Sequence, residues 1–496
     1  MKISDFQPTI GLEIHAELNT KSKMFCSCPN DPEEHHPNVN ICPICIGHPG
    51  VLPVINKEAV KKTIKVGLAL HCHISQDPKF DRKSYFYPDL PKGYQISQFY
   101  IPLCKNGYLE VNGRKIRIRE IHLEEDTGKL IHDEKENCSL VDFNRAGVPL
   151  MELVTEPDIK SAEEARLFAQ ELQLILRYLN VSSADMEKGQ MRVEANISVG
   201  KNGKLGTKVE IKNLNSFRAV EKGINYEIKR QINLLKSVKR IVQETRGWQE
   251  KEGITVSQRE KEESHDYRYF PEPDLPPLFI TKEYLDKVKS EIPELPSMRK
   301  KRFNREYGLG EKEIETFVRN KDLGEYFEKV VSELKDWVKS IEMKSKISDT
   351  EQRKLIKLCS NYILTDLQGL LRKTGVSGED FLITPENFAE FITLIYEGKI
   401  SSKIAKIILV EMFETGADPS HIIEKKELVQ INDTGEIEDL AKKIISANKK
   451  AVDDYKRGKI AVLKFLIGQL MKETRGKVDP QKAEEIFRRL LTNLSK

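Results

Sequence analysis

The chain has 496 residues, more than one hydrophobic core ordinarily serves, so two or three domains are expected. Hydrophobic residues make up 39% and charged residues 32%, a balance typical of a globular protein with a charged surface. The formal net charge is only +4, so nucleic acid would have to be bound by local basic patches and not by the field of the whole molecule. The N-terminal residues do not resemble a signal peptide, and no apolar run approaches the roughly 18 residues of a membrane span. A cytoplasmic protein without a membrane partner is therefore predicted.

The first 294 residues are rich in short alternating segments. Residues 9–18, 115–126, 191–199 and 208–212 alternate apolar and polar side chains with the period of two of a half-buried strand. An amphipathic helix follows Ser161, which with Glu164 predicts a capping box. Because the strands are grouped and do not alternate strictly with helices, we expect an α+β fold with an antiparallel sheet.

Four cysteines lie within twenty residues, in the pattern C-x-C, thirteen residues, C-x-x-C. They are Cys26, Cys28, Cys42 and Cys45. Four thiolates at this spacing can close a tetrahedral Zn²⁺ site, which would be structural because no ligand position stays open. The alternative is that some of them are only small buried apolar residues, and His35, His36 or His48 could replace one thiol.

Charged side chains recur on one face of three predicted strands. These are Glu13 and His15, then Arg192, Glu194 and Asn196, and then Lys208, Glu210 and Lys212. For any single strand a solvated outer face is the simpler interpretation. Carboxylates and a histidine mixed with basic side chains nevertheless suit a divalent cation and phosphate groups. The acids of the segment HLEEDTG, residues 122–128, could join them or could merely cap a turn.

Two loops crowd polar residues and prolines together, at 142–158 and 257–275, which indicates rigid loops facing a charged ligand. The sequence contains no P-loop and no G-x-S-x-G elbow, so any nucleotide must be bound in another way and release of ammonia by this chain itself is not expected.

Prolines after Tyr269, in PEPDLPPL and EIPELP, mark a boundary near residue 294. Beyond it the sequence predicts Lys/Glu-rich amphipathic helices, with a second change near residue 425. The basic run MRKKRFNREYG, residues 298–308, could contact RNA, although a solvated helix face is the simpler interpretation.

Taken together, longer segments resemble the B subunit of the tRNA-dependent aspartyl/glutamyl amidotransferase. The matching segments are IGLEIHAEL, KSYFYPDLPKGYQISQ, IHLEEDTGKL, DFNRAGVPLMELVTEPD, MRVEANISV, KVEIKNLNSF, SQREKEESHDYRYFPEPDL and the C-terminal VDDYKRGKIAVLKFLIGQLMKETRGKVDP. The resemblance covers essentially the whole chain. It implies a cradle domain at 1–294 that holds the synthetic site, a helical tRNA-binding domain at 295–425 and a helical tail at 426–496 that contacts tRNA.

The resemblance implies a two-step reaction on misacylated Glu-tRNA(Gln) or Asp-tRNA(Asn). ATP phosphorylates the side-chain carboxylate of the attached amino acid, and ammonia then displaces the phosphate to form the amide. The implied partners are an amidase A subunit that supplies ammonia, a small C subunit and the misacylated tRNA, with the cognate non-discriminating aminoacyl-tRNA synthetase as a further candidate. The implied cofactors are ATP and Mg²⁺.

By position in these motifs, the resemblance assigns Mg²⁺ to His15, Glu125 and Glu210, with Glu13, Glu124 and Glu194 as neighbours. It places Lys208, Lys212 and Arg192 at the ATP phosphates, and Asn144, Arg145, Ser257 and Arg259 at the substrate or nucleotide. Strand alternation puts Glu124 and Glu125 on opposite faces, so the choice between them stays open. Zinc rests on the cysteine spacing, since only some members of the family carry that loop.

Two other functions remain as alternatives. A non-catalytic tRNA-binding protein would account for the C-terminal region but leaves the charged strand faces without a task. A stand-alone ATP-dependent ligase that takes free ammonia would account for the charged faces but not for the helical regions.

Overall fold

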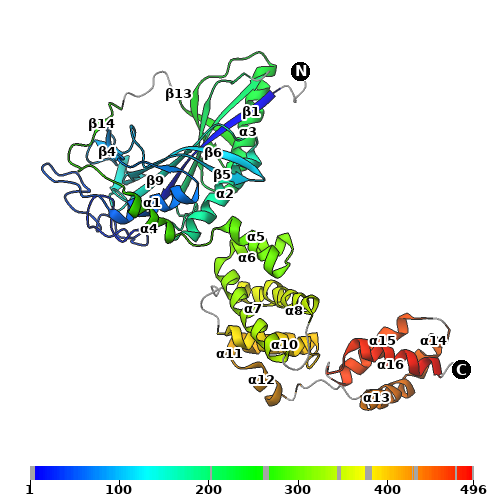
Figure 1. Cartoon of the computed structure of the whole chain (residues 1–496). Coiled ribbons are helices and arrows are strands. Elements are labelled where there is room, and N and C mark those ends of the chain that lie inside the picture. The colour runs from blue at the N-terminus through cyan, green and yellow to red at the C-terminus, as the bar shows by residue number, and fades with distance from the viewer. Residues whose placement is uncertain are drawn as a thin grey trace. The chain divides into compact units, whose positions relative to one another are not determined.

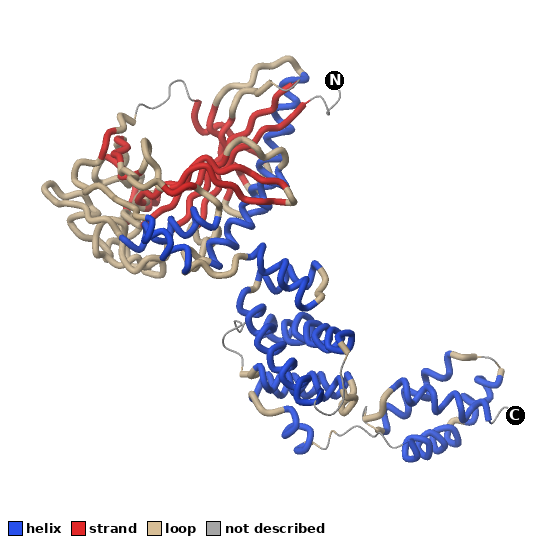
Figure 2. Tube along the Cα trace, in the orientation of Figure 1, coloured by secondary structure: helices blue, strands red, loops and turns tan. Residues whose placement is uncertain are grey.

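The computed structural model describes residues 6–133, 135–201, 204–260, 267–342, 348–374, 382–426, 428, 434–457, 459–474 and 477–493. The chain divides into two compact units, described separately below; the first ends at Pro296 and the second begins at Ser297. Strands occur only in the first unit among the described residues, and the second is helical, as the colours of Figure 2 show. The predicted α+β region followed by helical regions is thus confirmed.

The strands of the first unit form three sheets (Figure 1). They are β1 (Phe6–Glu17), β2 (His73–Ile74), β3 (Asp81–Ser84), β4 (Tyr94–Ser97), β5 (Cys104–Val111), β6 (Arg114–Glu125), β7 (Lys129–Asp133), β8 (Cys138–Asp142), β9 (Pro149–Thr155), β10 (Met191–Lys201), β11 (Val209–Leu214), β12 (Glu244–Gln249), β13 (Ile254–Glu260) and β14 (Phe270–Pro271). The main sheet has nine strands in the order β13-β12-β11-β10-β1-β9-β6-β5-β2. Its pairs are antiparallel except β11 and β12, which are parallel because a helix crosses over between them.

One face of the main sheet is covered by helices. The helices of this unit are α1 (Lys57–Ala69), α2 (Ala162–Tyr178), α3 (Phe217–Lys236) and α4 (Lys282–Ser290). Alternate side chains of β1, from Ile10 to Ala16, are buried in one hydrophobic core with Phe168 of α2 and Val220 of α3. In Figure 1, α2 and α3 run along this side of the strands. The polar side chains of the same strands therefore point away from these helices.

The start of α2 differs in one detail from the predicted capping box. The Ser161 hydroxyl accepts a hydrogen bond from the Glu164 amide at 3.1 Å, as expected. The Glu164 carboxylate, however, accepts from the amide of Lys160 and not from that of Ser161. Its other oxygen is bound by Arg114 of β6, which draws the carboxylate away from the reciprocal bond.

The second unit is built from helices. They are α5 (Pro296–Tyr307), α6 (Glu311–Arg319), α7 (Lys321–Glu342), α8 (Asp349–Tyr362), a π-helical turn η2 (Ile363–Leu367), α9 (Gln368–Thr374), α10 (Pro385–Tyr396), α11 (Ser402–Thr415), α12 (Pro419–Lys425), α13 (Thr434–Ala447), α14 (Lys449–Lys456), α15 (Ala461–Glu473) and α16 (Pro480–Asn493). Helices α13 to α16 share a hydrophobic cluster that includes Leu466 and Phe487. Of the described helices, none is both long and apolar enough to cross a membrane.

Candidate active site

The open face of the main sheet carries a cluster of carboxylates and imidazoles, which we call the carboxylate cluster. Its members are Glu13, His15, His122, Glu124, Glu152, Glu194 and Glu210. They form three overlapping groups, and within each group the ligand-type atoms lie within 4.8 Å of one another. The central strands β6, β9, β1, β10 and β11 each contribute at least one member, so the cluster exists only once the sheet is paired.

His15 lies at the centre of the first group. Its Nε2 is 3.3 Å from Glu152, 3.7 Å from Glu124 and 4.0 Å from Glu13. Nε2 of His122 is 2.9 Å from the same carboxylate oxygen of Glu152. Burial opposes protonation of His15, but the hydrogen bond to Glu152 and the surrounding carboxylates outweigh it and raise the pKa of His15 to about 9.

The other end of the cluster is formed by three glutamates on adjacent strands. Glu13 and Glu194 are register partners across β1 and β10, and Glu210 follows on β11. Lys212 lies 2.9 Å from Glu194 and 3.7 Å from Glu210. Burial and repulsion by Glu152 raise the pKa of Glu13 to about 7. This end thus holds more negative charge than its neighbours neutralise, a condition that a bound cation relieves.

Side chains beside the cluster leave room for a ligand. A hollow of about 260 Å³ on the same face is lined by residues that include Gly11, Asn196 and Lys208. The Oδ1 atom of Asn196 is buried and has no hydrogen-bond partner among the described residues. Carboxylate, imidazole and amide oxygen or nitrogen donors of this kind fit Mg²⁺, which is held by a few protein ligands together with water and phosphate oxygens.

The predicted magnesium ligands need one correction, because the structure does not bring His15, Glu125 and Glu210 together. Glu124 lies in the cluster, while Glu125 points to the opposite side of β6. There Glu125 binds the Lys92 ammonium and accepts from the Ile96 amide at 3.0 Å. Strand alternation is the physical reason: successive side chains of a strand lie on opposite faces.

Arg192 reaches a second acidic group next to the cluster. It is the register partner of His15, and its guanidinium donates to Asp126 at 3.0 Å. Arg145 lies 3.7 Å from the same carboxylate and donates to the carbonyl oxygens of Thr127 and Gly128. Burial opposes ionisation of Asp126, yet Arg192 and Arg145 lower its pKa. Arg192 and Arg145 are thus joined through Asp126.

The remaining predicted residues lie farther from the carboxylates. Asn144 accepts from the Asn40 amide and donates to the His36 carbonyl, so it binds a neighbouring loop and not the cluster. Ser257 lies on β13 opposite Arg246, where it lowers the pKa of Glu244 through a hydrogen bond. The backbone of Arg259 pairs with Thr245 on β12, and its side chain is outside the described residues.

Three residues of this face were missed as site residues by the sequence analysis. Glu152 is the single acid within the apolar strand β9, a signal that could have revealed it. His122 shares the face of Glu124. Lys83 comes from the separate sheet of β3; burial opposes its charge, but Glu124 and Tyr269 raise its pKa. Nothing local in the sequence indicates that Lys83 approaches the cluster.

The four cysteines converge as a group in the loop 26–45, here called the cysteine loop. The sulfur atoms of Cys26, Cys28, Cys42 and Cys45 lie within 4.8 Å of one another. The hydrogen bond from Cys26 lowers the pKa of the Cys45 thiol to about 5, and burial raises that of Cys28 to about 11. Four sulfur donors at this separation fit a tetrahedral Zn²⁺ ion.

Comparison with protein families gives two matches along the chain. Residues 8–286 match the GatB/GatE catalytic domain, and residues 325–491 match the GatB domain. The carboxylate cluster and the cysteine loop both lie within the first match.

Curated relatives match over nearly their whole length. A Thermotoga maritima protein is 48% identical, with 98% of this chain and 99% of the relative aligned. Proteins of Caldicellulosiruptor saccharolyticus and Thermosipho melanesiensis are 48% and 49% identical, with 99% and 98% of this chain and 100% and 99% of the relatives aligned. All three are named as the B subunit of an aspartyl/glutamyl-tRNA(Asn/Gln) amidotransferase.

Proposed function

Because the chain belongs to the family of aspartyl/glutamyl-tRNA(Asn/Gln) amidotransferase B subunits, we propose that it is the synthetic subunit of such an enzyme. It phosphorylates the side-chain carboxylate of misacylated Glu-tRNA(Gln) or Asp-tRNA(Asn) with ATP and converts the product to the amide with ammonia. The match to a catalytic domain over residues 8–286 favours this function over a non-catalytic tRNA-binding protein.

The carboxylate cluster is the observation that carries the proposal. A carboxylate substrate reacts poorly with ammonia because oxide is a poor leaving group, whereas phosphate leaves readily. To form the acyl phosphate, the substrate carboxylate must approach a triphosphate although both are negative. Their repulsion has to be offset by cations held in fixed positions. A partly buried group of acids beside basic side chains provides such positions.

The residues present fit a magnesium site on this sheet face. Glu13, His15, Glu124, Glu152, Glu194 and Glu210 are the candidates to hold the ion, directly or through water. Magnesium, when bound, neutralises charge on the phosphate oxygens. For the imidazole of His15 to ligate a cation, it must give up the proton that its carboxylate neighbours now favour.

Basic side chains around the cluster are suited to phosphate. Lys212 lies beside Glu194 and Glu210, and Lys208 lines the adjacent hollow. Lys83 approaches Glu124 and Glu152 from the other side, with its ammonium 5.0 Å from the ring centre of Tyr267. These cations would orient the triphosphate and offset charge that develops during phosphoryl transfer.

The proposed partners follow from the chemistry that this chain lacks. The relatives are named as one subunit of an enzyme of more than one chain, and ammonia has to come from a separate amidase chain. A small third subunit and the misacylated tRNA complete the proposed complex, in the cytoplasm. The helical unit supplies the proposed tRNA contacts.

The proposal is tested by ATP turnover of the purified chain, alone and in its complex. ADP formation should depend on misacylated tRNA and Mg²⁺, and ammonium chloride should replace the amidase chain in amide formation. Glu210→Gln should abolish ADP formation while tRNA affinity changes less than about twofold, since the substitution alters one charge of the cluster. The matched control Glu187→Gln changes an exposed glutamate and should behave as wild type. ATP hydrolysis that ignores tRNA, or unchanged turnover in Glu210→Gln, would refute the assignment.

A further inference from the structure

The side chain of Lys23 is completely buried, which is rare for lysine. Its ammonium donates a hydrogen bond of 3.2 Å to the carbonyl oxygen of Phe143 and one of 3.8 Å to the Sγ atom of Cys45. Lys23 thus joins the cysteine loop to the turn formed by residues 142–148, which we call the Arg145 turn.

A buried ammonium requires negative charge beside it, because the cost of removing it from water is several kcal/mol. The carbonyl of Phe143 offers only a dipole. Cysteine thiolates that hold a zinc ion carry net negative charge as a group, and Cys45 places that charge at the ammonium. The position of Lys23 therefore suits a metal-filled cysteine site and suits four neutral thiols poorly.

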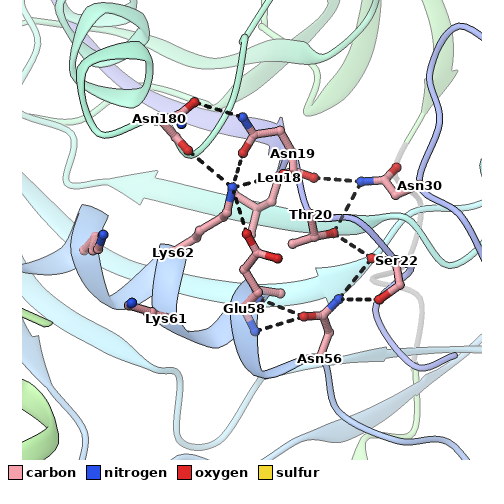
Figure 3. Close-up of polar contacts among 12 residues, drawn as sticks. Leu18, Asn19, Thr20, Ser22, Asn30, Asn56, Glu58, Lys61, Lys62 and Asn180 are labelled. Carbon is pink, nitrogen blue, oxygen red and sulfur yellow. Dashed lines mark hydrogen bonds and ion pairs between the residues drawn. The ribbon is translucent and has the colours of Figure 1, made fainter. Parts of the chain in front are cut away.

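The backbone of Lys23 is held from two directions. Its amide donates to the carbonyl of Cys28 at 3.0 Å, and its carbonyl accepts from the Asn56 side chain at 3.1 Å. Asn56 also caps α1 and binds Ser22, and Asn30 binds Leu18 and Thr20 (Figure 3). This polar network anchors the segment before the cysteine loop, so Lys23 cannot follow the Arg145 turn if the turn moves.

The cysteine loop makes further hydrogen bonds to the Arg145 turn and its approach. Asn38 donates to the Val141 carbonyl at 3.0 Å and accepts from the Phe143 amide at 2.8 Å. Asn144 binds both Asn40 and His36, at 2.9 and 2.7 Å. These bonds come from loop residues between Cys28 and Cys42, a stretch too short for a core of its own.

The turn also packs closely on the metal site. Gly147 has φ +83°, and a Cβ atom there would lie 3.5 Å from the Cβ of Cys45 and 3.6 Å from the Cδ of Lys23. Its carbonyl accepts from the Met24 amide at 2.7 Å. The position of the turn is therefore set by the residues that flank the sulfur atoms.

We propose that Lys23 is a positioning residue that transmits metal occupancy of the cysteine site to the Arg145 turn. The turn carries Arg145, which is linked through Asp126 to Arg192, the register partner of His15. Metal loss removes the charge that holds the Lys23 ammonium, and the Phe143 carbonyl loses its donor. The consequence for catalysis rests on the proposed function, whereas the structural coupling does not.

The coupling is tested in the full-length chain by hydrogen exchange of residues 141–148, with zinc bound and after chelation. Zinc removal should speed exchange of these amides about tenfold or more in wild type, the scale of effect typical of residues that support metal ligands. Lys23→Met with zinc bound should already exchange fast, and chelation should add little. Lys23→Arg should restore part of the protection. Lys21→Met changes an exposed lysine two residues away and serves as the matched control.

Cobalt substitution gives a second readout that a merely structural role would not move. The thiolate-to-cobalt absorption bands should shift in Lys23→Met and not in Lys21→Met, because only Lys23 lies at a sulfur atom. Wild-type exchange in zinc-loaded Lys23→Met, or unchanged exchange after zinc removal from wild type, overturns the proposal. The wild-type chelation arm decides the case even if Lys23→Met fails to fold.

Activity in the assembled complex provides the functional arm. Lys23→Met and zinc-free wild type should both lose about tenfold in kcat, and the two changes together should cost no more than either alone. Additive losses would overturn the coupling. Wild-type complex without any amide formation would instead refute the proposed function and leave the exchange result standing.

Discussion

His15 and Glu152 are register partners on β1 and β9, and their side chains meet at 3.3 Å. The same carboxylate lies 2.9 Å from Nε2 of His122, so one acid holds two imidazoles. Burial opposes ionisation of Glu152, but the imidazoles outweigh it and hold its pKa well below the usual range. Glu152 thus links the two strands on either side of β9.

Glu152→Gln should therefore weaken the centre from its middle. The amide keeps the size of the side chain but removes the charge shared by His15 and His122, so we expect kcat to fall about 100-fold and affinity for Mn²⁺, used as a probe for Mg²⁺, to fall as well. Electron paramagnetic resonance of free Mn²⁺ measures the affinity. Glu163→Gln, at a 68% exposed side chain of α2, is the control. Wild-type Mn²⁺ affinity in Glu152→Gln would exclude this carboxylate from the cation site.

The opposite faces of Glu124 and Glu125 predict different defects for neighbouring substitutions. Glu124→Gln removes a carboxylate 3.7 Å from His15, so Mn²⁺ affinity and ADP formation should fall about tenfold or more. Glu125→Gln breaks the buried contact with Lys92 and should lower thermal stability with Mn²⁺ affinity retained. Calorimetry and Mn²⁺ titration of both variants separate the effects. The opposite pattern would restore the magnesium assignment of Glu125.

The cysteine site predicts a stoichiometric metal. Purified wild type should contain one zinc ion per chain, and Cys42→Ser should lose it and unfold at a temperature several degrees lower, because metal binding supplies the stability of the loop. Cys138→Ser alters an exposed cysteine on β8 and should keep both zinc and stability. Elemental analysis and calorimetry measure these changes. Zinc-free wild type with unaltered stability would leave the four cysteines without a metal role.

Acid stability of the helical unit should depend on Glu328. Its carboxylate accepts from Arg299 at 2.6 Å and from Arg302 at 2.5 Å; burial opposes its charge, but the arginines lower its pKa below 4.5. Near pH 4.5 the unfolded chain begins to bind a proton that the folded chain refuses. The stabilisation is thus present above pH 4.5 and lost as the pH falls through the lower folded pKa.

Glu328→Gln should lower the free energy of unfolding by about 2 kcal/mol at pH 7 and flatten its decline between pH 5 and 3. Calorimetry across this range is the measurement. Glu325→Gln, at a half-exposed pair on the same helix, is the control. Parallel pH curves for wild type and Glu328→Gln would contradict the predicted pKa shift.

Sequence alone determined which side chains share a face of each strand. The period of two in β1, β10 and β11 placed Glu13 with His15, Arg192 with Glu194, and Glu210 with Lys212, whatever the strands pair with. The cysteine spacing likewise predicted one local cluster, since all four residues lie in one short loop. The motifs also identified the family, which the comparisons confirmed.

Only the tertiary structure decided which faces meet. Strand order β10-β1-β9-β6 put Glu152 between His15 and His122, and pairing of distant segments brought Lys83 toward the same place. It also buried Lys23 between Cys45 and the Arg145 turn, two elements separated by about a hundred residues of chain. Local periodicity specifies the direction of a side chain along its own strand, but the distance between side chains of different strands depends on sheet order and register, which are settled by burying the whole core at once.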